Sequence, residues 1–250
     1  MSDMMKRLFK FEIYKILRKP SFYTCLAVCA LLFVLEATSA ASLYGYYHIT
    51  CVDLFEGIHF EGVMTTALTL GVFTLLYFRD DGKGAIKHVI GWGYTRMQYL
   101  CCKTVCATAI YTAYTLLSAI VSLIIAIIVT GGFGGMSLMH LLVFLLNWLW
   151  GVMMLAFAAL LASLFKRTGA AMSLFFVIPF VGVTVFALID LFVFLFSSMF
   201  VVTEYWFSLL YFSTAQSVSA LEAVRMLLTT LAYLTGFAGG TWLLLRRREY

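Results

Sequence analysis

Four short clusters of basic residues divide this chain into very long apolar stretches, and this alternation constrains its fold more than any other feature. The clusters, at residues 6–19, 79–103, 166–167 and 246–248, hold sixteen of the seventeen Lys and Arg residues, and Arg225 is the exception. Basic residues that flank membrane spans are retained on the cytoplasmic side. We therefore expect all four clusters, and both termini, on the cytoplasmic side of a cell membrane.

The composition supports a membrane protein. The chain is 63% hydrophobic and only 12% charged, which is more apolar surface than one soluble core of 250 residues could bury. The net charge of +5 lies at the ends of the apolar stretches, where anionic headgroups attract it. This charge therefore indicates topology and not a nucleic-acid partner.

The lengths of the apolar stretches predict an all-α, polytopic fold with six transmembrane helices, because about 20 apolar residues cross a hydrocarbon core of about 30 Å. The expected spans are residues 21–43, 58–78, 105–129, 138–165, 170–188 and 226–245. The apolar run at 170–202 is too long for one span, and two spans there would place the last basic cluster outside. We expect this run to break near Asp190, with an outer re-entrant or interfacial segment at about 190–212.

Two further units complete the expected organisation. Residues 1–20 are expected to form an interfacial elbow helix, and residues 21–250 a single transmembrane domain with its longest cytoplasmic connection at 79–103. In the elbow helix, apolar residues recur at helical spacing opposite Arg7, Lys10 and Arg18, which favours a helix lying along the inner leaflet. Pro20 ends it. The same pattern would also fit a simple topology anchor.

Sequence motifs of catalysis are missing. The glycines beside Lys83 lack the spacing of a phosphate-binding loop, G-x-x-x-x-G-K-[ST]. None of the four histidines has a second histidine four residues away, as an H-E-x-x-H site needs. The Cys25/Cys29 and Cys102/Cys106 pairs are better explained as small apolar residues in lipid. We expect no enzyme activity and no metal site in this chain.

The 79–103 connection contains a short apolar face on a helix bounded by glycines. Ile86, Val89 and Ile90 lie at helical spacing, and Trp92 follows. A cytoplasmic helix with an exposed apolar face indicates a protein partner.

In these two segments the chain resembles the membrane subunits of small six-span ABC exporters, which move polysaccharides, drugs and peptides outward. Glu12 and the basic residues after it match the acid and spaced bases of the family's elbow helix. The family's coupling helix, between spans two and three, has a motif whose positions are matched by Asp80, Gly84, Lys87, Arg96 and Lys103. The chain departs from the motif where Asp80 replaces Glu and Ala85 replaces Thr.

The resemblance implies a permease subunit that pairs with a second permease copy or a paralogue and with cytoplasmic ATPase subunits. ATP and Mg would bind to the ATPase, and this chain would bind no cofactor. The implied ATPase-contact residues are Asp80, Gly84, Ile86, Lys87, Val89, Ile90, Trp92 and Arg96. The implied elbow residues are Phe9, Glu12, Ile13, Lys15, Ile16, Leu17 and Arg18. Small subunits of this kind are similar to exporters of amphipathic peptides and to lantibiotic self-protection pumps.

Acidic residues in the outer half suggest a cargo. Glu36 lies about two-thirds of the way across the first span, and Asp53, Glu56 and Glu61 follow, which favours an amphipathic, cationic peptide. The expected substrate path contains Glu36, Glu61, Asn147, Phe176, Pro179 and Phe180. Two alternatives stay open at this stage. Glu36 and Glu61 could instead hydrogen-bond to Ser, Thr or Asn147 inside the bundle, and the protein could be a membrane anchor or sensor that transports nothing.

Overall fold

The computed structural model describes residues 3–47, 50–79, 89–132, 135, 137–165, 167–194, 205–207 and 218–247. Its principal elements are α1 (Asp3–Leu17), α2 (Pro20–Tyr47), α3 (Cys51–Arg79), α5 (Arg96–Thr130), α6 (Leu138–Leu164), α7 (Thr168–Phe194) and α8 (Ala220–Arg247). Every helix in this set except α1 is long and apolar enough to cross a membrane. The prediction of an all-α fold with six helices of spanning length is confirmed for the part of the chain that the structure describes.

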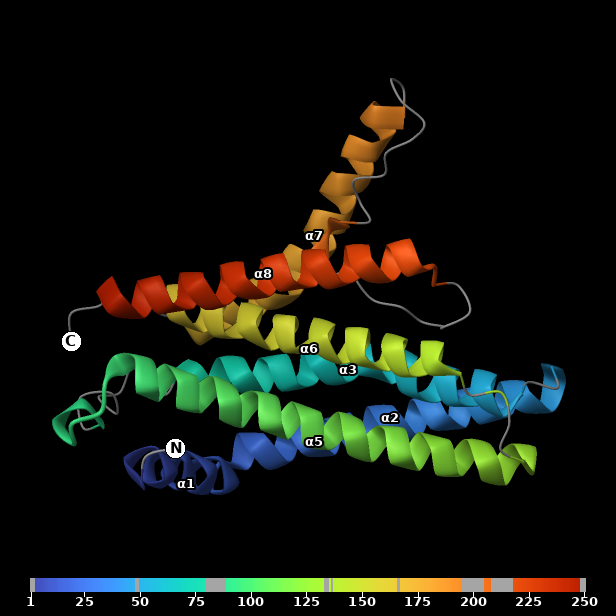
Figure 1. Ribbon diagram of the computed structural model, residues 1–250, viewed down its shortest axis with the longest axis horizontal. Helices are drawn as coiled ribbons and strands as arrows, with labels where there is room; N and C mark the ends of the chain where they lie inside the picture. Colours follow the sequence, from blue (N-terminus) through green and yellow to red (C-terminus); the bar gives the residue numbers. More distant parts are fainter. Residues whose placement is uncertain are drawn as a thin grey trace.

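The centre of the bundle is made by α3 and α6 (Figure 1). Within the most apolar window of each helix, 65% of α3 and 56% of α6 is buried, whereas only 6% of α2 is. The outer helices expose large apolar side chains, among them Leu31, Leu117 and Leu228. Such a surface suits lipid as the surrounding solvent, since a helix that is apolar all round is stable only when buried or in a membrane.

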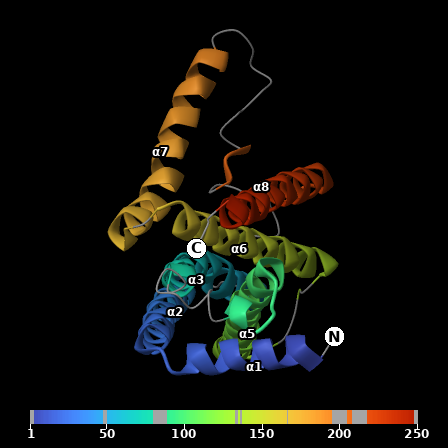
Figure 2. The same cartoon turned by 90° about the vertical axis from the view of Figure 1, so that its left-hand side faces the viewer.

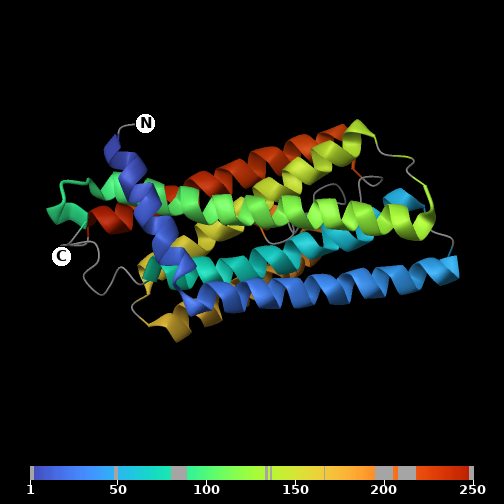
Figure 3. The same ribbon diagram turned by 90° about the horizontal axis from the view of Figure 1, so that it is seen from below.

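One end of the bundle gathers most of the described basic residues, and we call it the basic end. Both chain termini lie there, as do the start of α5 and the end of α8 (Figure 1). Arg79 at the end of α3, Arg96 at the start of α5 and Arg246 near the end of α8 belong to it. Arg225, near the start of α8, lies at the opposite end. Helix α1 lies crosswise over the basic end (Figures 2 and 3).

Helices α3 and α5 begin seven and nine residues before the predicted spans, and local caps explain both. Residues 51–57 were expected in an outer connection, but α3 starts at Cys51. There Thr50 and Asp53 cap the helix, since the Thr50 amide donates to Asp53 Oδ2 (3.1 Å) and the Asp53 amide donates to Thr50 Oγ1 (3.3 Å). Helix α5 starts at Arg96, because Thr95 and Gln98 form a reciprocal capping box.

The expected break near Asp190 is wrong, because α7 continues through Asp190 to Phe194. The helix changes direction earlier, and its second half leads away from the bundle (Figure 2). Pro179 lies inside α7, where a proline removes one backbone hydrogen bond and bends the helix. Trp206 packs against the bend, and its indole Nε1 donates to the carbonyl oxygen of Pro179 at 3.0 Å. Most of the expected outer segment, residues 195–204 and 208–212, lies outside the described residues.

Candidate functional site

The apolar residues of α1 divide between the bundle and its surroundings. Leu8, Glu12 and Ile16, spaced by four residues, are buried. Phe9 is half-buried and packs against the core, while Ile13 and Leu17 are exposed by 39% and 49%. Of the predicted apolar residues, Ile16 packs into the bundle with Leu8, whereas Ile13 and Leu17 stay exposed.

A buried polar cluster fixes α1 to two spans. The Tyr77 hydroxyl of α3 donates to Glu12 Oε2 at 2.5 Å. The Lys103 ammonium of α5 donates to the Tyr77 carbonyl oxygen at 2.9 Å and lies 4.4 Å from the centre of the Tyr77 ring. Glu12 is 0% exposed and Lys103 only 1%. We call these three residues the Glu12 cluster.

Further cations surround this cluster. The Lys19 ammonium lies 5.1 Å from the centre of the Tyr77 ring, and the Lys15 ammonium lies 4.0 Å from Glu12 Oε1. An ammonium over an aromatic face is stabilised by the negative potential of the ring. The buried carboxylate is thus balanced by nearby positive charge, as a buried charge requires. The two motif positions Glu12 and Lys103, 91 residues apart in the sequence, meet through Tyr77, which the sequence analysis missed.

In the segment before α5, some predicted contact residues are buried and others are exposed. Val89 is 2% exposed, and its carbonyl oxygen accepts from the Trp92 and Tyr94 amides at 3.2 and 3.4 Å. Gly93 has a φ of 86°, a left-handed conformation that glycine adopts without strain, and it closes this turn. The prediction of Val89 as a contact residue is therefore wrong, since it supports the turn from inside. Asp80, Gly84, Ile86 and Lys87 lie outside the described residues.

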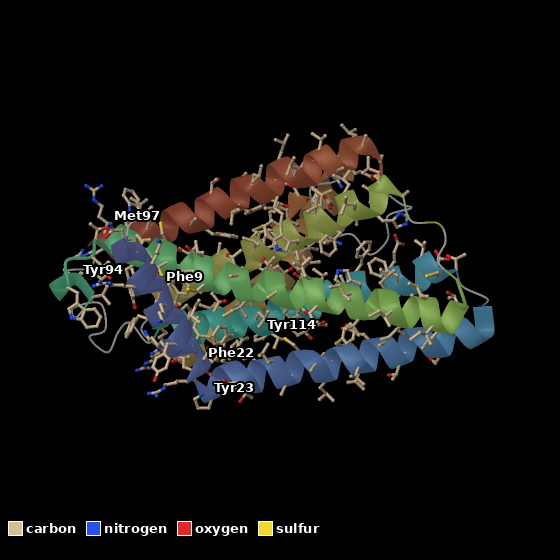
Figure 4. The ribbon with its side chains drawn as sticks, turned by 60° about the horizontal axis from the view of Figure 1, so that its bottom comes forward. Phe9, Phe22, Tyr23, Tyr94, Met97 and Tyr114 are labelled. Atoms are coloured by element: carbon tan, nitrogen blue, oxygen red, sulfur yellow. The ribbon has the colours of Figure 1, made fainter. Side chains whose placement is uncertain are left out.

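Exposed apolar side chains from two elements gather beside this turn. Trp92 is 59% exposed and meets Phe11 of α1 edge to face, with ring centres 5.8 Å apart. Ile90 and Met97 are also exposed, and Met97 lies at the basic end near the start of α5 (Figure 4). We call Phe11, Ile90, Trp92 and Met97 the aromatic patch. Phe11 was missed because it lies off the apolar stripe of α1.

Arg96 borders this patch and has a structural contact of its own. Its side chain is exposed, and its guanidinium donates to the carbonyl oxygen of Arg246 at 3.2 Å. The bond joins the start of α5 to the end of α8. Arg96 therefore contributes to holding two spans together at the basic end.

Glu36, the central residue of the expected substrate path, binds a neighbouring helix. Thr65 Oγ1 of α3 donates to Glu36 Oε1 at 2.8 Å. Gly62 of α3 makes room for the carboxylate, because a Cβ there would lie 2.6 Å from Glu36 Oε2. The alternative of a hydrogen bond inside the bundle is confirmed for Glu36. The side chain of Glu61 lies outside the described residues.

The other expected path residues face different surroundings. Asn147 is fully buried in α6 and Pro179 is buried at the bend of α7. Phe176 and Phe180 lie on the exposed side of α7. The described residues of this single chain therefore do not join into the path that the sequence suggested.

The acidic residues at the opposite end are engaged in local structure. Glu56 is 2% exposed, and its Oε1 lies 3.2 Å from His140 Nε2 of α6. The Ser137 amide donates to His140 Nδ1 at 3.0 Å, so Nδ1 is an acceptor and the ring proton lies on Nε2, the nitrogen nearer Glu56. Asp53 caps α3. The expectation that these two acids form an open surface for cations is wrong for the conformation described.

The close contact of Glu36 with Gly62 allows a direct test. Gly62→Ala should lower the melting temperature in detergent, because the added methyl group displaces the Glu36 carboxylate from Thr65. Gly57→Ala is the matched control on the same helix, since the nearest atom to its Cβ would be Ala40 Cβ at an ordinary 3.9 Å. The double variant Gly62→Ala/Glu36→Ala should lose less stability than the sum of the losses in the two single variants. Strict additivity would contradict the contact.

Comparison of the sequence with models of known protein families and with curated proteins finds no match in either set. The function is therefore argued from the geometry of the basic end. That end combines an exposed aromatic patch with a buried ion cluster beneath the same helix.

Proposed function

We propose that this chain is the membrane-spanning permease subunit of an ATP-driven ABC exporter in the cell membrane, with its basic end in the cytoplasm. The observation that carries the proposal is the aromatic patch, where Trp92 and Phe11 remain exposed at the end of the bundle that also holds Arg79, Arg96 and Arg246. Basic residues at this end lie at the level of headgroups and water, which places these rings outside the hydrocarbon core. A partially exposed Trp with apolar neighbours is the usual centre of a protein interface.

The Glu12 cluster supports this function because it makes the patch a rigid extension of two spans. Phe11 precedes Glu12 on α1, and Glu12 is bound to Tyr77 of α3 beside Lys103 of α5. A partner that pushes on Phe11 and Trp92 therefore also moves α3 and α5. Cytoplasmic ATPase subunits would bind ATP and Mg and hydrolyse the nucleotide, while this chain would bind neither and transmit the motion.

The cargo class and the second subunit follow from the resemblance to small exporters. An amphipathic, cationic peptide would leave between this chain and a second permease copy or paralogue. Phe176 and Phe180 on the exposed side of α7 are available to line that route from the outside of the bundle. Glu36 is then a packing residue, because its carboxylate already accepts from Thr65.

Substitution of Trp92 tests the docking. A tagged chain purified from its native membrane should carry a subunit that hydrolyses ATP. Trp92→Ser should lower the apparent affinity for that subunit about 30-fold, the loss typical of truncating a central interface Trp. Leu164→Ser, at another exposed apolar position at the basic end, is the matched control and should change the affinity less than twofold.

Two results would contradict the proposal. If no ATP-hydrolysing subunit accompanies the wild-type chain, the membrane anchor or sensor alternative is favoured. If such a subunit accompanies the chain, its affinity should fall more for Trp92→Ser than for Leu164→Ser. An equal loss of affinity would mean that docking does not use the aromatic patch.

A further inference from the structure

An apolar groove lies beneath α1, where this helix crosses α2 and α5. Its volume is about 210 Å³. The residues that form it include Phe9, Ile13 and Leu17 of α1, Phe22 of α2, and Ala109 and Ala113 of α5. Phe9 and Phe22 mark its two ends along α1 in Figure 4. The groove exists because two alanines leave α5 thin where the larger side chains of α1 pass over it.

The groove continues along α5 away from the basic end. A second furrow of about 570 Å³ runs from Thr104 to Leu116 and shares Ala109 and Ala113 with the first. The twelve steps of helical rise from Thr104 to Leu116 cover about 18 Å, which is close to half of a hydrocarbon core of about 30 Å. The Thr104 and Thr112 hydroxyls donate to carbonyl oxygens of their own helix, so the furrow presents an apolar wall. Its length and chemistry fit one acyl chain of one leaflet.

Positive charge lies beside the mouth of the groove. Lys6 and Lys10 are exposed and flank the side of α1 that carries Phe9 and Ile13, since residues three or four apart are neighbours on a helix. The sequence interpretation had placed Lys10 opposite the apolar residues, but its spacing of three from Ile13 makes it their neighbour. The acid of this part of α1, Glu12, points the other way and is buried against Tyr77. The groove therefore combines an apolar interior with a cationic rim.

We propose that this groove binds an anionic phospholipid of the inner leaflet, with one acyl chain along α5 and the phosphate beside Lys6 and Lys10. A transmembrane helix of a second copy is too wide for the space beneath α1, because a helix with its side chains is about 10–12 Å across. An acyl chain gains little from leaving other acyl chains, so the headgroup charge must provide the selectivity. This site is independent of the proposed export function.

The first experiment fills the groove. The purified chain, without any ATPase, is mixed with dioleoyl phosphatidylglycerol or dioleoyl phosphatidylcholine, and bound lipid is counted by native mass spectrometry. Ala109→Phe should reduce retained phosphatidylglycerol about tenfold. Ala27→Phe is the matched control, since Ala27 is also exposed but lies on α2 outside the groove, and it should have no effect.

The second experiment removes charge from one side of α1 at a time. The double variant Lys6→Gln/Lys10→Gln should lower the preference for phosphatidylglycerol over phosphatidylcholine about 30-fold, as the loss of two headgroup contacts predicts. Arg7→Gln/Arg18→Gln removes the same charge from the other side of α1 and should change it less than twofold.

Three outcomes would overturn the proposal. Retention of lipid by Ala109→Phe would show that the groove is not the site. Equal losses in the two charge variants would indicate diffuse attraction to the headgroup layer. A change of oligomeric state in Ala109→Phe with unchanged lipid would assign the groove to a second protein chain. None of these outcomes bears on ATPase docking through Trp92, so the two proposals fail separately.

Discussion

Lys103→Met should destabilise the folded chain by about 3–5 kcal/mol, the usual cost of removing one partner from a buried group of charges. Lys103 is 1% exposed, and its ammonium binds the Tyr77 carbonyl oxygen and faces the Tyr77 ring. Its loss leaves the buried Glu12 carboxylate with less positive charge nearby. Thermal unfolding in detergent, followed by circular dichroism, should show a large fall in melting temperature.

A second lysine near Glu12 provides the control, because its side chain is less buried than that of Lys103. Lys15 also lies near Glu12, with 4.0 Å between Nζ and Oε1, but 21% of its side chain is exposed. Lys15→Met should therefore cost less than Lys103→Met, because part of the Lys15 side chain is exposed and its ammonium, although buried, approaches Glu12 only to 4.0 Å. Adding Glu12→Gln to Lys103→Met should restore part of the stability, because the unbalanced charge is removed. Equal effects of the two lysine variants would contradict a special role for the Glu12 cluster.

The same variant reports on the proposed mechanism. If α1 is released from α3 and α5, a docked ATPase can still bind Trp92 but can no longer move these spans. Lys103→Met should then keep ATPase binding while ATP hydrolysis loses its response to cargo. Trp92→Ser should instead lose the binding itself.

The number and approximate positions of the membrane-spanning helices could be predicted from the sequence, because they depend on the length of apolar runs and on the distribution of charge between them. Apolar runs of 20 or more residues define six helices, and the basic clusters define which ends lie together. Helix starts were less accurate, since caps such as Thr50 with Asp53 depend on two side chains and not on average hydropathy. The continuation of α7 past Asp190 was missed for a related reason. One acid inside an apolar run does not stop a helix, whereas Pro179 bends it.

The faces of the helices were harder to assign, because lipid and protein interior are both apolar. On α1, the pattern identified Phe9, Ile13, Ile16 and Leu17 but could not show that Ile16 packs inward with Leu8 and Glu12 while Ile13 and Leu17 stay exposed. In a soluble protein the apolar face of a helix packs against the core, so the periodicity alone would identify the packed face. In a membrane the stripe can face lipid.

At the candidate site, too, the sequence predicted some features, and others depend on the fold. The sequence identified Trp92 and Ile90 correctly as exposed, yet it placed Val89 beside them, because helical spacing does not reveal that a turn at Gly93 buries Val89. Tyr77 and Phe11 lie far in sequence from the residues they contact. Only the fold brings these pairs together.

Gly151→Ala should be among the most damaging changes inside the bundle, although alanine is normally better than glycine in a helix by about 1 kcal/mol. Gly151 of α6 is buried against the ring of Tyr111 of α5, and a methyl group there would overlap the ring, whose Cε1 would lie 2.8 Å away. Tyr111 is 0% exposed, so its ring has no space to rotate into. The two helices must separate, which also strains the bond from Trp148 Nε1 to Thr112 Oγ1 at 2.9 Å.

The expected loss for Gly151→Ala is about 1–3 kcal/mol or more, as in other overpacked cores. Gly236→Ala is the matched control, because Gly236 lies inside α8 with no atom within 4 Å of its added Cβ. This control should gain up to about 1 kcal/mol. The two substitutions should thus shift the melting temperature in opposite directions, and Tyr111→Leu should recover part of the loss in the Gly151→Ala background. A shift in the same direction for both glycines would mean that α5 and α6 do not approach each other at Tyr111 in the folded protein.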